Sequence, residues 1–105
     1  MTPVLVIVTA SNEEEAQKIT NVLVEEHLAA CVNASSGVSS TYWWQGKVET
    51  GTEIVLTIKT SRELWPIVGE RVRELHSYKC PEIIAIPVVE ADPDYLEWWR
   101  KALDQ

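Results

Sequence analysis

The residues best suited to chemistry lie close together, between positions 76 and 82. His76, Tyr78, Cys80 and Glu82 place an imidazole, a phenol, a thiol and a carboxylate within seven residues, directly before an apolar run typical of a buried strand. Imidazole, thiolate and carboxylate groups are all ligands for copper(II) or zinc. Two interpretations stay open: a metal or small-ligand site, and the polar rim of a subunit contact.

Two further polar side chains are candidates for the same chemistry. Cys31 lies at the start of a predicted strand, where a thiol is either an inert buried group or a soft metal ligand. Lys59 shares a strand face with Val55, and an ammonium among apolar residues needs a carboxylate or an anion as its partner. We expect that partner to be Glu82, a neighbouring chain or a bound ligand.

Aromatic side chains offer a different kind of site. Trp44, with Tyr95, Trp98 and Trp99, has the composition of a pocket for a flat ligand, although such residues more often anchor a core or an interface. Tyr42 lies near Trp44 and is a candidate neighbour of the polar cluster. The sequence has no nucleophile elbow, glycine-rich phosphate loop, HExxH or CxxC motif, so we expect a protein that is not an enzyme.

Length and charge limit the classes of partner. The 105 residues predict a single domain, residues 1–105, with a modest core that oligomerisation would supplement. Nine basic against sixteen acidic residues give a net charge of -7, which repels nucleic acids and anionic membranes. Two widely spaced cysteines indicate reduced thiols, and the apolar run 4–8 is too short for a signal peptide or a membrane span. We therefore expect a cytoplasmic protein.

Apolar periodicity and turn signals predict the order βαββαβ followed by a terminal helix. The expected strands are residues 4–9, 30–44, 47–60 and 83–89, with a bulge at 35–37 and a tight reversal at Gln45-Gly46. The first expected helix begins with a Ser11–Glu14 capping box and ends near Leu28. The second begins at a Thr60 or Ser61 cap and stops before Tyr78. The third begins at Asp92-Pro93. Pro87 predicts that the last strand lies at an edge.

This order is typical of the α+β class and of the ferredoxin-like sandwich, with strand order 4-1-3-2 and two helices on one face. Strands of about fourteen residues would span about 46 Å, whereas the first strand would cover only about 20 Å. The central hairpin must therefore project beyond the sheet. Because it carries Tyr42, Trp43 and Trp44, we expect another copy of the chain to cover it.

The same topology separates two of the candidate ligands. Cys31 starts the second strand at one end of the sheet, whereas His76 follows the second helix at the opposite end. A site that uses both must therefore lie between subunits. Within one subunit the plausible group is His76, Cys80 and Glu82, with Tyr42 nearby.

Five groups of residues form a pattern that runs along nearly the whole chain. They are Leu28-Ala29-Ala30-Cys31-Val32-Asn33, the set Ser40, Tyr42, Trp44, Gly46, Val48, Glu49 and Glu53, Ile58-Lys59-Thr60, the set His76, Tyr78, Pro81, Glu82 and Ile83, and the pair Tyr95 and Trp98. In this order they resemble the CutA family of divalent-cation tolerance proteins. The chain departs from the family pattern at Ser77, where proline is usual, and at Cys80, where an apolar or small residue is common.

The resemblance implies a homotrimer of ferredoxin-like subunits, similar in architecture to the nitrogen-regulatory PII proteins. It also implies binding of Cu(II) or another divalent cation, with Cys31, His76 and Glu82 as ligands and Tyr42, Trp44, Lys59 and Tyr78 near the intersubunit cleft. Cys80 would add a soft ligand peculiar to this chain. The alternative is a PII-like signalling or adaptor module whose cleft binds a small metabolite.

Overall fold

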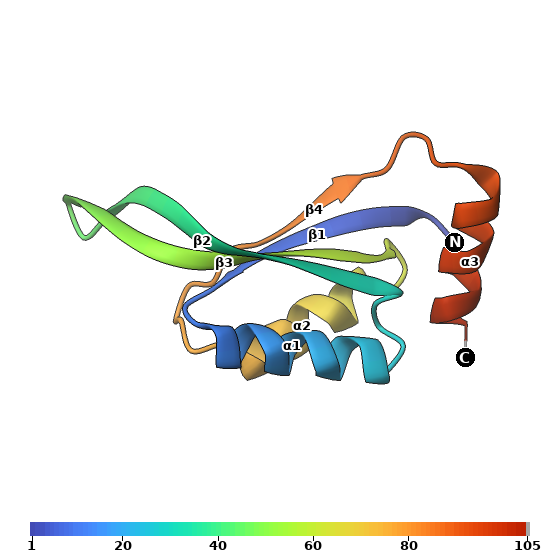
Figure 1. Ribbon diagram of the computed structural model, residues 1–105, viewed down its shortest axis with the longest axis horizontal. Coiled ribbons are helices and arrows are strands. Elements are labelled where there is room, and N and C mark those ends of the chain that lie inside the picture. The colour runs from blue at the N-terminus through green and yellow to red at the C-terminus, as the bar shows by residue number, and fades with distance from the viewer. Residues whose placement is uncertain (105) are drawn as a thin grey trace.

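A computed structural model describes residues 1–104 as a four-stranded antiparallel sheet with three helices (Figure 1). The elements are β1 (Pro3–Ala10), α1 (Glu13–Glu25), β2 (Cys31–Trp44), β3 (Lys47–Ser61), α2 (Trp65–Leu75), β4 (Ile83–Pro87) and α3 (Pro93–Leu103). The sheet order is β2-β3-β1-β4, which confirms the predicted strand order. Pro87 lies on the edge strand β4, as expected for a residue that cannot donate to a ladder.

Helices α1 and α2 cover one face of the sheet, and their apolar stripes form the core with it (Figure 1). Alternate residues of β1 and β3, among them Val6, Leu56 and Ile58, are fully buried against Ile19 and Leu23 of α1. Helix α3 packs separately at the end of the sheet near the N-terminus. Its Trp99 is buried, and the indole Nε1 donates to the carbonyl of Thr60 at 3.0 Å.

The hairpin of β2 and β3 projects beyond the sheet (Figure 1). Strand β1 pairs with β3 only over residues 54–61, so residues 38–53 form a two-stranded ribbon, referred to below as the ribbon. The register shifts between Ser35 and Val38, which confirms the predicted bulge. The reversal at Gln45-Gly46 has positive φ at both residues, the geometry of a tight hairpin turn. Trp43 near its tip is 75 % exposed.

Two of the predicted helix caps are wrong in detail. Asn12, not Ser11, caps α1, and its side chain accepts from the N–H of Glu15 at 2.8 Å. Helix α2 begins at Trp65 without a side-chain cap, because the Ser61 hydroxyl instead accepts from Leu64 N in the preceding turn. The other boundaries agree within a few residues. The cap of α3 is confirmed, since the Asp92 carboxylate accepts from the first N–H groups of that helix.

The face of the sheet opposite α1 and α2 is open (Figure 1). The strand register lays two rows of side chains across it: Cys31, Lys59, Leu5 and Ile86, then Asn33, Thr57, Ile7 and Ile84. Ile84 and Ile86 are 49 % and 44 % exposed. We call these two rows the open face. None of the helices within residues 1–104 is long and apolar enough to cross a membrane.

Candidate cation-binding cavity

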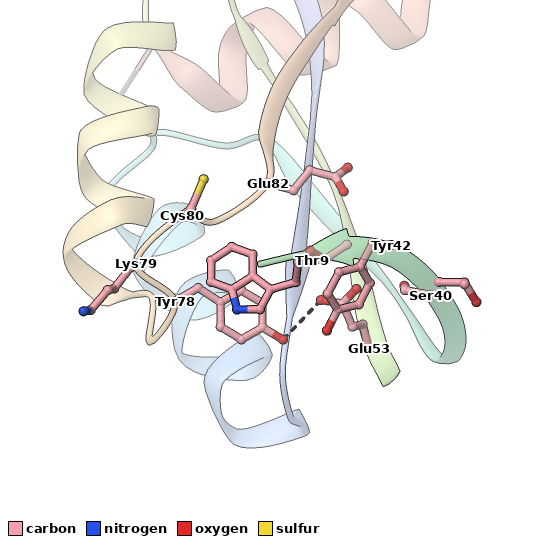
Figure 2. Close-up of a pocket in the computed structure, with 10 residues that line it drawn as sticks. Thr9, Ser40, Tyr42, Glu53, Tyr78, Lys79, Cys80 and Glu82 are labelled. Carbon is pink, nitrogen blue, oxygen red and sulfur yellow. Dashed lines mark hydrogen bonds between the residues drawn. The ribbon is translucent and has the colours of Figure 1, made fainter. Parts of the chain in front are cut away.

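A cavity of about 610 Å³ lies where the ribbon meets the segment between α2 and β4 (Figure 2). Its lining comes from four parts of the chain: the end of β1, the outer part of β2, the ribbon residue of β3 that directly precedes the β1-paired part, and the segment 78–82. The lining residues are Thr9, Ser40, Thr41, Tyr42, Trp44, Glu53, Tyr78, Lys79, Cys80 and Glu82. Seven side-chain types with hydrogen-bonding or ligand atoms thus face one space.

Strand alternation explains how the ribbon contributes to this lining. Ser40, Tyr42 and Trp44 are two residues apart along β2, so they lie on one face of the strand, and Trp43 lies on the other. Glu53 enters from β3, where it pairs with Val38 of β2. A regular ribbon therefore presents two aromatic rings and a carboxylate to the same side.

Tyr78 joins the two walls of the cavity. Its phenol donates to Glu53 Oε2 at 3.2 Å, the bond that is dashed in Figure 2. Burial, and next the negative charge of Glu53, raise the pKa of the Tyr78 phenol to about 12. Tyr78 therefore acts as a hydrogen-bond donor throughout the physiological pH range.

His76 holds this tyrosine in place and does not line the cavity. Its side chain is fully buried, Nε2 lies 2.6 Å from the carbonyl of Thr9, and Nδ1 accepts from the N–H of Tyr78 at 3.1 Å. These partners fix the tautomer with the proton on Nε2, so both ring nitrogens are engaged in this conformation. Two members of the predicted group, Cys80 and Glu82, therefore share the cavity, whereas the third, His76, supports its wall.

Glu15 is a functional neighbour that the sequence analysis missed. Its carboxylate accepts from the N–H and hydroxyl of Ser11 and from the N–H of Ser77, and it lies 3.8 Å from His76 Nδ1. Burial raises the pKa of Glu15, but the hydrogen bonds from Ser11 and Ser77 outweigh it and lower the pKa overall. The sequence signal was the position three residues after the true cap, Asn12, where an acid reaches back over the helix start.

Cys31 and Lys59 lie together on the open face, away from the cavity. Lys59 Nζ donates to Asn33 Oδ1 at 2.6 Å and lies 3.7 Å from Cys31 Sγ. Within the chain the partner of Lys59 is thus an amide, and the expected pairing with Glu82 is wrong. Lys59 pairs with Leu5 of β1, whereas the cavity begins at Thr9, about 13 Å further along that strand.

The cavity has the donor types for a divalent cation but lacks a finished site in one chain. Cys80, Glu82 and Glu53 supply a thiol and two carboxylates, groups that suit borderline metal ions such as copper and zinc. Among residues 1–104, no three histidine, cysteine, aspartate or glutamate side chains converge in a way that could hold a metal ion. A tight metal site therefore requires either additional ligands from outside this cavity or a rearrangement of residues 78–82.

These features define a small α+β subunit with a ferredoxin-like sheet, a projecting ribbon and a cavity at the base of that ribbon. Its sequence matches the family described as CutA1 divalent ion tolerance protein over residues 4–102. The chain belongs to this family. The resemblance drawn from the motifs is confirmed.

Individual relatives agree with the family match. The divalent-cation tolerance protein CutA of Thermus thermophilus is 45 % identical over 97 residues, which cover 92 % of this chain and 94 % of that protein. A CutA structure from the same organism has a TM-score of 0.93 at 44 % identity and covers 95 % of this chain and 97 % of that one. CutA from Xylella fastidiosa has a TM-score of 0.95 at 41 % identity, covering 99 % and 100 %.

The mammalian and plant relatives are longer. This chain matches 54 % of the human protein CutA, at 40 % identity, and 56 % of the chloroplastic protein CutA 1 of Oryza sativa, also at 40 % identity. The chain therefore spans about half the length of these relatives.

Proposed function

We propose that this protein is a homotrimer that binds Cu(II) or another divalent cation in the seams between its copies and contributes to divalent-cation tolerance without catalysing a reaction. The observation that carries the proposal is the cavity: in a member of the divalent ion tolerance family, a thiol and two carboxylates face one space. The net charge of -7 adds a field that attracts cations.

Cys80 and Glu82 are the central ligands of this proposal. They are exposed and lie on the segment leading into β4, so they can adjust to an ion more readily than side chains in the middle of a strand. Glu53 stands across the cavity as a third donor. His76 supports the site through Tyr78, and Cys31 joins only if a neighbouring copy brings it there.

The open face supports the trimer. Leu5, Ile7, Ile84 and Ile86 form an apolar strip that α1 and α2 leave uncovered, and an exposed strip of this kind marks an interaction surface. The exposed Trp43 on the ribbon adds a second apolar surface. Burial of both by further copies would also enclose the polar pair Lys59 and Asn33.

We also propose a cytoplasmic location, because both cysteines are free thiols and such thiols persist in reducing compartments. The relatives differ in this respect. The Oryza sativa relative is named chloroplastic, and the Archaeoglobus fulgidus relative is named periplasmic.

Isothermal titration of the purified protein with CuCl₂ and ZnCl₂ tests the metal site. We expect the variants Cys80→Ser and Glu82→Gln each to weaken Cu(II) binding by about tenfold or more, since each removes one ligand. Glu90→Gln, an exposed acid outside the cavity, is the matched control and should bind like the parent protein. Unchanged binding in both ligand variants would contradict the proposal.

A second candidate function is a small-molecule-binding signalling module, and the size of the cavity favours it. About 610 Å³ lies within the range of roughly 300 to 1,000 Å³ typical of small-molecule sites. A thermal-shift screen separates the candidates, because a ligand that binds only the folded chain raises the melting temperature. Stabilisation by metabolites and not by divalent cations would favour the second function.

A further inference from the structure

We propose that the cavity at the base of the ribbon binds an organic ammonium ion, held by the rings of Tyr42, Trp44 and Tyr78 and by the carboxylates of Glu53 and Glu82. This inference goes beyond the metal site, since it requires no metal ligand and no thiol. It concerns the chemical class of a ligand that fills the cavity.

The first argument is size. A cavity of about 610 Å³ is far larger than one water molecule, whose share of liquid volume is about 30 Å³. A bare divalent ion bound to Cys80 and Glu82 would occupy only a small part of it. The remaining space suits an organic molecule.

The second argument is the arrangement of the aromatic side chains. Tyr42 and Trp44 come from one face of β2, and Tyr78 comes from the segment after α2, so rings approach the cavity from two walls. Within a single chain each of the three is between 39 % and 48 % exposed, so the core of that chain does not bury their rings. The faces of tyrosine and tryptophan rings attract ammonium ions within about 6 Å.

The third argument is charge. Glu53 and Glu82 place two carboxylates in the lining. The basic lining residue Lys79 directs its amine away from Tyr42, Tyr78 and Glu53 (Figure 2). At the ribbon tip Glu49 is the cross-strand partner of Tyr42 and Lys47 that of Trp44, so these two residues add one negative and one positive charge. The cavity therefore favours a cation over an anion or a neutral ring.

The fourth argument is that the aromatic wall is held in place before a ligand arrives. The hydrogen bond from Tyr78 to Glu53 fixes one ring and one carboxylate relative to each other. His76 accepts from the N–H of Tyr78 and Glu15 accepts from the N–H of Ser77, so the backbone is held at Tyr78 and just before it. An aromatic wall that is already in place loses little entropy when a ligand arrives. Because Tyr78 keeps its proton at physiological pH, the Glu53 carboxylate stays the only negative partner in this pair.

The test uses tetramethylammonium chloride as the probe, followed by two-dimensional amide NMR of the full chain. We expect saturable shifts of the Tyr78 and Cys80 amides and of the Trp44 indole N–H. Potassium chloride at the same concentration controls for salt, and tert-butanol is a neutral molecule of similar shape. If either control shifts the same resonances equally, or if no shift saturates, the proposal is wrong.

Variants then assign the interaction. Trp44→Leu should weaken tetramethylammonium binding by about fivefold, the effect of one lost cation–π contact. Trp43→Leu is the matched control, because Trp43 lies on the opposite face of the strand and outside the lining. Equal losses in the two variants would overturn the proposal. Tyr42→Leu should weaken binding while Tyr42→Phe, which keeps the ring, should retain most of it.

Variants of a carboxylate and of the thiol distinguish ammonium binding from metal binding. Glu53→Gln should weaken tetramethylammonium binding, whereas Cys80→Ser should leave it unchanged while weakening Cu(II). A loss of ammonium binding in Cys80→Ser would contradict the inference. Binding of Cu(II) without any binding of tetramethylammonium would refute the inference and leave the metal proposal standing.

Discussion

The two faces of the sheet differ in what covers them. On the helix side, Val6, Leu56 and Ile58 are fully buried beneath α1 and α2. On the open face, Ile84 and Ile86 stay about half exposed, in the same rows as the polar group of Cys31, Asn33 and Lys59 at the other side of the sheet. The same strands thus form a fully buried core on one side of the sheet and a partly exposed apolar surface on the other.

This difference separates the residues that stabilise the fold of one chain from the residues that are available to bind other copies or ligands. The covered face contains apolar side chains in a regular alternation, and it accounts for the stability of one chain. The open face and the projecting ribbon contain exposed apolar residues and most of the polar candidates. These are the surfaces that further copies and ligands must complete.

The largest effect should come from a cavity in the covered face. Ile58→Ala should lower the free energy of unfolding by about 2–5 kcal/mol, because Ile58 is fully buried and its neighbours cannot fill the space. Urea unfolding monitored by circular dichroism measures this loss. Its size should not depend on protein concentration.

Ile86→Ala on the open face is the matched comparison. Its effect should vary with protein concentration over the range in which copies of the chain associate, since Ile86 would then be buried between copies. A concentration-independent loss as large as that of Ile58→Ala would mean that the two faces do not differ in the way described here.

The next largest effect should come from Glu15, which joins the helix layer to the segment that lines the cavity. Glu15→Gln should cost about 2 kcal/mol, because charge-assisted hydrogen bonds from Ser11 and Ser77 are weakened. The pKa of Glu15 is lowered in the folded state, so its contribution is present above pH 4.5 and is lost as the pH falls below that value. Parent and variant should therefore converge in stability at acid pH, as urea titrations at several pH values would show. A constant difference from neutral to acid pH would exclude this role.

A smaller effect is expected at Tyr78. Tyr78→Phe should cost about 1 kcal/mol, the typical contribution of one hydrogen bond. The folded-state pKa is raised from 10.0 to about 12, so the stabilisation is present below pH 10 and is lost as the pH rises towards 12. Ultraviolet titration of the tyrosines should show one late-ionising phenol that Glu53→Gln shifts to lower pH. If the late ionisation survives in Tyr78→Phe, it belongs to another tyrosine.

The smallest effect should be seen with thiol labelling, which compares the two regions without disturbing the fold. Cys80 is exposed, whereas Cys31 is half-buried beside Lys59. Iodoacetamide should modify Cys80 first, and the change in unfolding free energy should stay below about 0.5 kcal/mol. Mass spectrometry of digested samples gives the two rates. Faster labelling of Cys31 would place it at an accessible surface in the assembly.

Most of the fold was predictable because it follows from local signals. The β-branched run of β1, the Gln45-Gly46 turn and the Asp92-Pro93 cap each favour one structure, and the length of β2 and β3 required a projecting ribbon. The cap of α1 was misplaced by one residue because Ser11 and Asn12 are both good capping residues, and only the fold decides between them.

The candidate site was predictable in its parts but not in its grouping. Spacing alone put His76 next to Cys80 and Glu82. In the fold, however, the His76 imidazole donates a hydrogen bond to the carbonyl of Thr9, 67 residues earlier, and this bond keeps the ring out of the cavity. Lys59 likewise donates a hydrogen bond to Asn33 across the β2–β3 ladder, and the strand register determines this contact. Contacts of this kind depend on tertiary packing, and a sequence pattern does not encode them locally.

Native mass spectrometry of the purified protein with CuCl₂ tests the central claim most directly, because it reports the number of chains and of bound ions together. The account predicts a particle of three 11.9 kDa chains that retains copper and loses it in Glu82→Gln. A single 11.9 kDa chain, or a trimer that carries equal copper with and without Glu82, would contradict it.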